Sequence, residues 1–167
     1  DGRQDAVTMA AYLPQPKMGE TFSSKIDLAG IAHYNPRLAD KYFTQGGSTA
    51  GNVAPSISPT RYADLIFDKI EEVVKANQRY LSIARRPADL YEDKRKGRKS
   101  ILFAIENGLA LEGNLANVKH FAQRGVTYIT LCHNGDNDIC DSARGCNTHG
   151  GVSSLGEKVI QEMNRCG

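Results

Sequence analysis

Two side chains able to do acid–base chemistry stand at the ends of predicted strands. Glu106 closes the apolar run SILFAIENG at residues 100–108, and His133 falls near the end of VTYITLCHNG at residues 126–135. The two are 27 positions apart, which is about one strand–helix repeat of a parallel α/β fold. Because the carboxyl ends of neighbouring parallel strands meet at one rim, we expect both side chains there. A carboxylate and an imidazole at one rim suit metal binding or general acid–base catalysis.

Each of these two residues also has a purely structural interpretation. Glu106 alone could cap the turn after its strand or pair with a lysine, and His133 alone could be a hydrogen-bonded histidine at the rim. The pair, one repeat apart, is what favours a functional site.

The other histidines and a group of aspartates give weaker signals. Three histidines are expected to be exposed in loops or on a helix surface: His33, His120 and His149. Asp136, Asp138 and Asp141 loosely suggest a calcium loop, but Cys140 occupies a position where the EF-hand pattern needs an oxygen ligand, and no glycine follows. We therefore predict a solvated loop here.

Predicted strands and helices alternate along the chain. Apolar and β-branched runs predict strands within residues 5–15, 80–84, 100–108 and 126–135. Helices are predicted from Ser58 and Pro59, from Pro87 to Gly97, up to Gly125, and from Ser154, where Glu157 completes a capping box. This order predicts βαβ units and a parallel sheet.

An open doubly wound sheet and a closed (β/α)8 barrel both satisfy this alternation. No glycine-rich phosphate-binding motif follows any strand, which weakens the nucleotide-binding version of the open sheet. A barrel takes about 250 residues, so a chain of 167 residues holds at most half of one. The stretch 14–58 is rich in proline and glycine and has no sustained hydrophobic period, so we predict an irregular surface insertion there.

Composition limits the partners. The net charge of +2, from 21 basic and 19 acidic residues, gives no electrostatic reason to expect nucleic acid or an anionic membrane. No apolar run approaches the roughly 20 residues of a transmembrane helix, so we predict a soluble protein, with its compartment open and export or the periplasm among the alternatives. None of the four cysteines forms a C-x-x-C zinc pair, and their disulfide state stays open.

Several stretches resemble signatures of the membrane dipeptidase family, also called renal dipeptidase. FAIENG, GVTYITLCHNGDND and GGVSSLGEKVIQEMNRCG are similar to three successive motifs of that family, and DAVTMAAYLPQ is similar to its second strand. The resemblance covers most of residues 5–13 and 80–167, in the family's order and spacing, and leaves the insertion at 14–58 unmatched. Members of this family are zinc peptidases on a (β/α)8 barrel.

The resemblance implies a role for each rim residue. Glu106 corresponds to the carboxylate that bridges two zinc ions, and His133 corresponds to a histidine that contacts the substrate near the scissile carbonyl. Two adjacent cations need a shared anionic ligand to offset their repulsion, and together they activate a water molecule. The implied reaction is hydrolysis of dipeptides that have a free carboxyl terminus.

The chain also departs from the family pattern. The family's His-x-Asp pair on the first strand would precede Asp1, and two further metal histidines would follow Gly167. Many members read Glu-Gly-Gly where this chain has Glu106-Asn107-Gly108, a change that keeps the ligand. The resemblance thus implies that residues 1–167 are the amino-terminal part of one barrel domain of the metal-dependent hydrolase type, inactive alone, with an incomplete zinc site.

Two alternatives remain beside the zinc dipeptidase. One is a small complete α/β domain that binds a ligand without catalysis, and the other is a barrel hydrolase with one metal. A small complete domain should hide its strand edges, whereas part of a barrel should expose edges and apolar faces. Part of a barrel should therefore pair with a second copy or with the remaining part of the barrel.

Overall fold

The computed structural model describes residues 4–44 and 55–167. In chain order its elements are β1 (Ala6–Tyr12), the 3-10 helix η1 (Phe22–Lys25), α1 (Leu28–Tyr34), α2 (Pro36–Tyr42), α3 (Pro59–Ala76), β2 (Leu81–Ile83), α4 (Pro87–Arg95), β3 (Lys99–Glu106), the 3-10 helix η2 (Gly108–Leu111), α5 (Leu115–Arg124), β4 (Val126–Thr130) and α6 (Ser154–Cys166). The alternation predicted from the sequence is confirmed for these elements.

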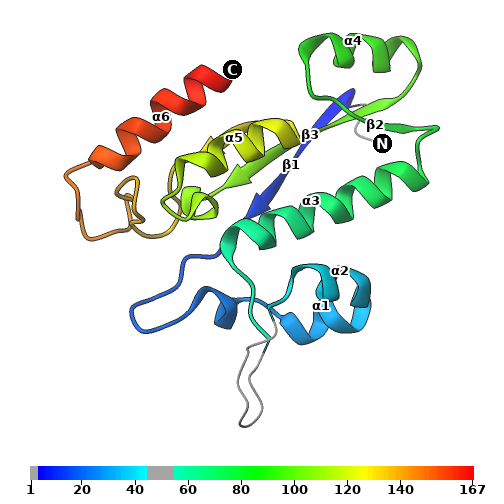
Figure 1. Ribbon diagram of the computed structural model, residues 1–167. Helices are drawn as coiled ribbons and strands as arrows, with labels where there is room; N and C mark the ends of the chain where they lie inside the picture. The colour runs from blue at the N-terminus through cyan, green and yellow to red at the C-terminus, as the bar shows by residue number, and fades with distance from the viewer. Residues whose placement is uncertain (1–3, 45–54) are drawn as a thin grey trace.

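The sheet is parallel and centred on β3 (Figure 1). Strand β1 pairs with β3 along its whole length, from Ala6 opposite Ser100 to Tyr12 opposite Glu106. On the other side of β3, β2 pairs with its first residues and β4 pairs with its last ones. The carboxyl ends of β1, β3 and β4 therefore lie together, as the sequence analysis expected of parallel strands.

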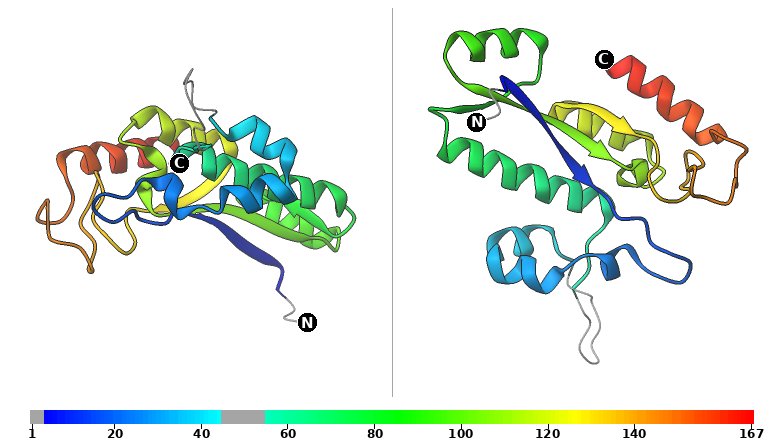
Figure 2. Two further views of the ribbon diagram at one scale, coloured as in Figure 1. Left: turned by 90° about the horizontal axis from the view of Figure 1, so that it is seen from below. Right: turned by 180° about the vertical axis from the view of Figure 1, so that it is seen from behind.

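Helices cover one face of this sheet (Figure 2). Phe103 and Ile105, two residues apart on β3, are fully buried on the helical side because alternate residues of a strand point to the same face. The ring of Phe103 stacks on Phe67 of α3 with centroids 4.6 Å apart, and Phe67 meets Phe121 of α5 edge-on. These three aromatic rings fix α3 and α5 against the central strand.

Ala104 and Glu106 point to the opposite face of β3. Glu106, its last residue, is therefore on the face that the three aromatic rings do not cover. Because the helices pack on the other face of the sheet, they leave Glu106 accessible at the end of the strand.

Strand β1 forms an apolar edge. Its Val7 and Met9 are 41% and 43% exposed, although the register places them beside Ile101 and Phe103 on the helical side of the sheet. Among the described residues β1 pairs only with β3. Exposed apolar residues on an unpaired strand edge are what the sequence analysis expected of part of a barrel.

The segment 14–58 is more ordered than the sequence predicted. Residues 45–54 lie outside the described residues, but residues 14–44 include η1, α1 and α2. Leu38 and Tyr42 of α2 are buried in a second apolar cluster with Leu65 of α3. The prediction of an irregular insertion is wrong for α1 and α2. Helix α1 packs on α2 and α2 packs on α3, and these contacts stabilise helices too short to show a hydrophobic period.

Helix ends follow the predicted caps with one correction. Ser58 caps α3, and Gly125 ends α5 with a φ of 87°, as the sequence indicated. The cap of α6 is Ser153 rather than Ser154, because the Ser153 hydroxyl accepts the Gly156 N–H at 3.0 Å. Within the described ranges, none of the helices is long and apolar enough to cross a membrane.

Candidate active site

Glu106 and His133 are in contact. The Nε2 atom of His133 lies 3.0 Å from Oε1 of Glu106, within hydrogen-bond distance. Glu106 is the last residue of β3, and His133 lies three residues beyond the end of β4, which pairs with β3 through Glu106 and Thr130. The prediction that both side chains lie at one rim is confirmed by this contact. Both are partly accessible, with side chains 40% and 34% exposed.

Tyr12 is the third side chain at this rim. It lies directly opposite Glu106 in the β1–β3 register, and its ring meets the His133 ring edge-on with centroids 5.1 Å apart. The aromatic edge limits how far the imidazole can turn. The second ring nitrogen of His133, Nδ1, is buried and has no hydrogen-bond partner in the part of the chain that the structure describes. His133 therefore has one nitrogen toward Glu106 and one unsatisfied.

Asn107 holds the residues around this rim in place, and the sequence analysis did not assign it a role. It is fully buried, and its φ of 89° lies in the left-handed region that favours glycine. Its side-chain Nδ2 donates to the Leu13 carbonyl and to Gln15 Oε1, both at 3.0 Å. Two residues that follow β1 are thereby tied to the end of β3.

The other atoms of Asn107 bind the β4 side of the rim. Its backbone N–H donates to the Thr130 hydroxyl at 2.8 Å, and its Oδ1 accepts from Asn137 Nδ2 at 3.0 Å and from the Leu109 N–H at 3.2 Å. A buried, satisfied polar group of this kind specifies one local arrangement. The residue next to Glu106 thus connects the ends of β1, β3 and β4 with the loop after β4.

The loop from β4 to α6 is built around two aspartates. Asp136 accepts from the backbone N–H of Ser142 at 2.8 Å and from the Thr148 hydroxyl at 2.8 Å, with further donors from the Cys146 and Thr148 backbone. These donors, the Ser142 N–H first, lower the pKa of Asp136 to about 2. Asp141 accepts from backbone N–H groups in the same loop.

Residues 143–152 are exposed, as expected of a solvated loop, but the hydrogen bonds of these two carboxylates also order it. Asp136 and Asp141 accept hydrogen bonds from loop N–H groups that have no carbonyl partner among the described residues. The carboxylate oxygens that would bind a cation are therefore already occupied by these donors. Their role is to shape the segment that follows His133.

Two neighbouring cysteine thiols, Cys132 and Cys140, lie in the segment that carries His133. The Sγ of Cys132 donates to the Asp141 carbonyl at 3.2 Å, and Cys140 is buried. Burial, reinforced by a hydrogen bond with Cys132, raises the pKa of the Cys140 thiol to about 12. Both are free thiols, as are Cys146 and Cys166.

The remaining histidines lie apart from the rim. His120 lies on the surface of α5 with its side chain 41% exposed, as predicted. Its Nε2 also lies 2.9 Å from Oδ2 of Asp64, a contact with α3 that the sequence did not indicate. His33 and His149 are exposed as predicted, although Nε2 of His149 lies 2.8 Å from the Asn137 carbonyl.

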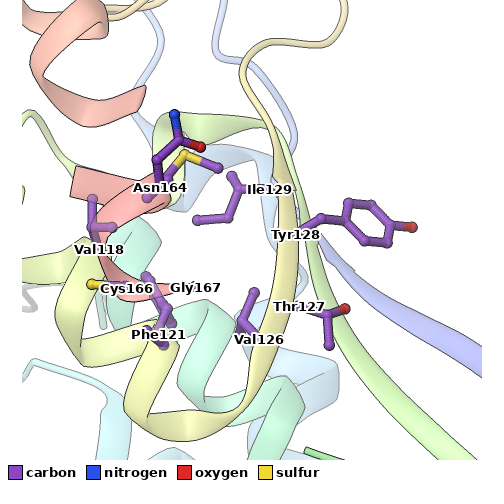
Figure 3. Close-up of a pocket in the computed structure, with 11 residues that line it drawn as sticks. Val118, Phe121, Val126, Thr127, Tyr128, Ile129, Asn164, Cys166 and Gly167 are labelled. Carbon is purple, nitrogen blue, oxygen red and sulfur yellow. The ribbon is translucent and has the colours of Figure 1, made fainter. Parts of the chain in front are cut away.

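An apolar hollow lies on the helical side of the sheet, away from the rim residues. It has a volume of about 250 Å³ and lies between α5, β4 and the end of α6. Figure 3 shows Val126 beside Phe121 and Ile129 on the same side of the strand nearer Asn164, whereas Tyr128 points to the other side of the strand. This hollow includes neither Glu106 nor His133, so its shape does not bear on their chemistry.

A metal centre fits these residues only in part. Glu106 offers the carboxylate oxygens that zinc binds, whereas the unpartnered Nδ1 of His133 is buried and is not the nitrogen that faces Glu106. Across residues 4–44 and 55–167, however, no three His, Cys, Asp or Glu side chains form a group able to hold an ion. These residues alone do not complete a zinc site.

Comparison with known proteins identifies the family. The model of the membrane dipeptidase family, peptidase family M19, matches residues 2–167. The chain belongs to this family. A relative, dipeptidase verJ from Clonostachys rogersoniana, is 31% identical over 102 residues, which are 60% of this chain and 26% of that protein. Dipeptidase 3 from Mus musculus is 37% identical over 71 residues, 40% of this chain and 14% of that protein.

Solved structures support the same fold. An amidohydrolase from Pseudomonas aeruginosa superposes with a TM-score of 0.57 at 28% identity, over 64% of this chain and 32% of that one. The probable dipeptidase PvdM from Pseudomonas aeruginosa gives a TM-score of 0.60 at 23% identity, over 63% and 28% of the two chains. The predicted α/β class, part of a (β/α)8 barrel, is confirmed. The matched part of this chain spans about a quarter of the length of verJ.

Proposed function

We propose that this chain carries one side of the active site of a zinc-dependent dipeptidase, and that residues 1–167 are the amino-terminal part of its barrel domain. The observation that carries the proposal is the contact between Glu106 and His133 at the carboxyl ends of parallel strands, in a chain of the membrane dipeptidase family. The substrate is a dipeptide with a free carboxyl terminus.

Each rim residue has a distinct part in this proposal. Glu106 would be the carboxylate that holds the zinc ions, and Asn107 positions it by fixing the backbone where β3 ends. His133 lies 3.0 Å from Glu106 and contacts the peptide near the scissile carbonyl. Tyr12 keeps the imidazole in that orientation through its edge-on contact. Zinc would supply Lewis-acid activation of water and of the carbonyl.

The described residues alone hold no group of three ligands, so the proposal places the remaining ligands in parts of the barrel beyond this chain. The relatives support this placement, since the aligned region is only 26% of verJ. The proposal therefore expects the 167-residue chain to be inactive without those parts.

Elemental analysis of the purified chain, dialysed against metal-free buffer, tests the ligand set. We expect much less than one zinc ion per chain. Two zinc ions per chain would contradict the proposal, because the ligands would then have to come from this chain or from a second copy of it.

Hydrolysis by the polypeptide extended on both sides tests the activity. We expect cleavage of dipeptides and no cleavage of the same dipeptides with an amidated carboxyl terminus. Glu106→Gln should reduce kcat/KM by at least about 100-fold, because a neutral amide is a poor shared ligand for two cations. Glu157→Gln removes an exposed carboxylate from α6 and is the matched control. Equal loss in both variants would contradict a specific role for Glu106.

A further inference from the structure

A second hollow begins at Tyr12, beside the candidate active site. Its volume is about 450 Å³, and it lies between the end of β1, helix α1 and Tyr62 of α3. A volume of this size is within the range of small-molecule sites. Because the Tyr12 ring also meets His133 edge-on, the hollow and the Glu106–His133 contact share one side chain.

The walls of this hollow are held firmly. Tyr42 of α2 donates its hydroxyl to Asp68 of α3 at 2.7 Å, and Arg61 of α3 donates back to the Tyr42 carbonyl at 2.6 Å. Ser23 of η1 donates to the Ile57 carbonyl at 3.0 Å. Figure 1 shows α1 and α2 at the end of the molecule to which β1 points. These bonds hold η1 and α2, the elements on either side of α1, beside α3 and the residues just before it.

The lining of the hollow is apolar and aromatic. Ile26 and Ile31 line it, together with Tyr12, Tyr34 and Tyr62. Ile26, Ile31 and Tyr62 also pack against the buried cluster of α2 and α3, so these walls have little freedom to collapse. Burial raises the pKa of Tyr62 above its usual value, whereas Tyr12 and Tyr34 are 39% and 80% exposed.

The two charged residues that line the hollow already have partners. Lys25 forms an ion pair with Glu20 at 2.6 Å, and the Asp27 carboxylate accepts the Gly30 N–H at 2.9 Å as the cap of α1. The Glu20 carboxylate offsets the Lys25 charge, whereas Asp27 is exposed and, among the described residues, only its Oδ1 accepts a hydrogen bond. Apolar and aromatic side chains outnumber the polar ones in the lining, so an apolar group matches most of the hollow.

We propose that this hollow binds an apolar side chain of the dipeptide whose peptide bond lies at Glu106 and His133, so that the segment 14–44 determines substrate preference. The inference rests on the proposed function, because it takes the occupant to be part of the substrate. Its physical basis is the continuity through Tyr12 of an apolar hollow with the Glu106–His133 contact.

Amide chemical shifts of the ¹⁵N-labelled chain during titration test this proposal without turnover. The probes are Leu-Leu and Gly-Gly, added to millimolar concentrations. We expect Leu-Leu to shift amides of Leu28–Tyr34 and Tyr12, and to bind at least about fivefold more tightly than Gly-Gly, because only Leu-Leu buries apolar side chains. Equal binding of both probes, or no shifts with either, would overturn the proposal.

Tyr34→Ala is the test variant, because Tyr34 lines the hollow and is 80% exposed, so its loss does not disturb the core. We expect Leu-Leu to bind about threefold or more weakly. Tyr91→Ala, at an exposed tyrosine of α4, is the matched control and should leave binding unchanged. Shifts centred on Phe121, in the hollow of Figure 3, would place the ligand elsewhere and overturn the proposal.

The two proposals fail in different ways. If the extended polypeptide does not hydrolyse dipeptides while Leu-Leu still shifts α1, the proposed function fails and the hollow is not a substrate site. If the extended polypeptide hydrolyses dipeptides but Leu-Leu leaves α1 unaffected, the hydrolytic function stands and the side-chain site is wrong.

Discussion

Replacing Asn107 by glycine separates the two contributions of this residue. Glycine accepts the φ of 89° but removes the four side-chain hydrogen bonds to Leu13, Gln15, Leu109 and Asn137. At about 0.5–1.5 kcal/mol of net stability each, these bonds contribute about 2–6 kcal/mol. Release of the backbone strain returns about 1–2 kcal/mol. Taking the middle of each range, about 4 kcal/mol lost and about 1.5 kcal/mol returned, we expect Asn107→Gly to lower the free energy of unfolding by about 2–3 kcal/mol.

Asn107→Ala is the comparison that isolates the backbone contribution. It loses the same four hydrogen bonds but keeps a side chain at positive φ, so it should be about 1 kcal/mol less stable than the glycine variant. Urea unfolding followed by far-UV circular dichroism measures both differences. A glycine variant as stable as the original chain would refute the hydrogen-bond reasoning, and an alanine variant equal to the glycine variant would refute the strain reasoning.

The same variants report on the rim itself. If Asn107 positions the strand ends, the nuclear Overhauser effect between the Tyr12 and His133 rings, whose centroids are 5.1 Å apart, should weaken in Asn107→Gly while the rest of the sheet keeps its contacts. An unchanged ring contact beside a lowered stability would mean that Asn107 stabilises the fold without orienting His133.

Three further outcomes follow from the loop, the thiols and the strand edge. The folded-state pKa of Asp136, about 2, lies below the ordinary value of 3.8, so its contribution is present above about pH 4. It is lost as the pH falls toward 2, so the protection factor of the Cys146 amide should fall over that range, but not in Asp136→Asn. Because burial raises the pKa of Cys140 to about 12, iodoacetamide at pH 8 should modify exposed Cys146 first and Cys140 only after unfolding. Met9→Glu on the apolar edge should reduce self-association in size-exclusion chromatography, whereas Met18→Glu, at a fully exposed methionine, should not.

Local chemistry in the sequence determined most of the elements around the site. Ser58 with Pro59, and Gly125 at positive φ, mark helix ends because capping depends on a few neighbouring residues. The apolar run ending at Glu106 marked both a buried strand and the position where chemistry could occur. His133 followed from the repeat length, since neighbouring parallel strands end at the same rim. Their contact at 3.0 Å agrees with that reasoning.

Only the tertiary structure decided what surrounds this pair. Helices α1 and α2 have seven residues each, too few to show a hydrophobic period, and they depend on packing against α3. The hydrogen bonds of Asn107 reach Leu13 and Gln15, 94 and 92 residues away in sequence, and no local pattern encodes such distant partners. The sequence by itself therefore determined where the strands end and which groups end them, because those signals are local. Which residues hold those groups in place, and which hollow opens beside them, depended on contacts made only in the folded chain.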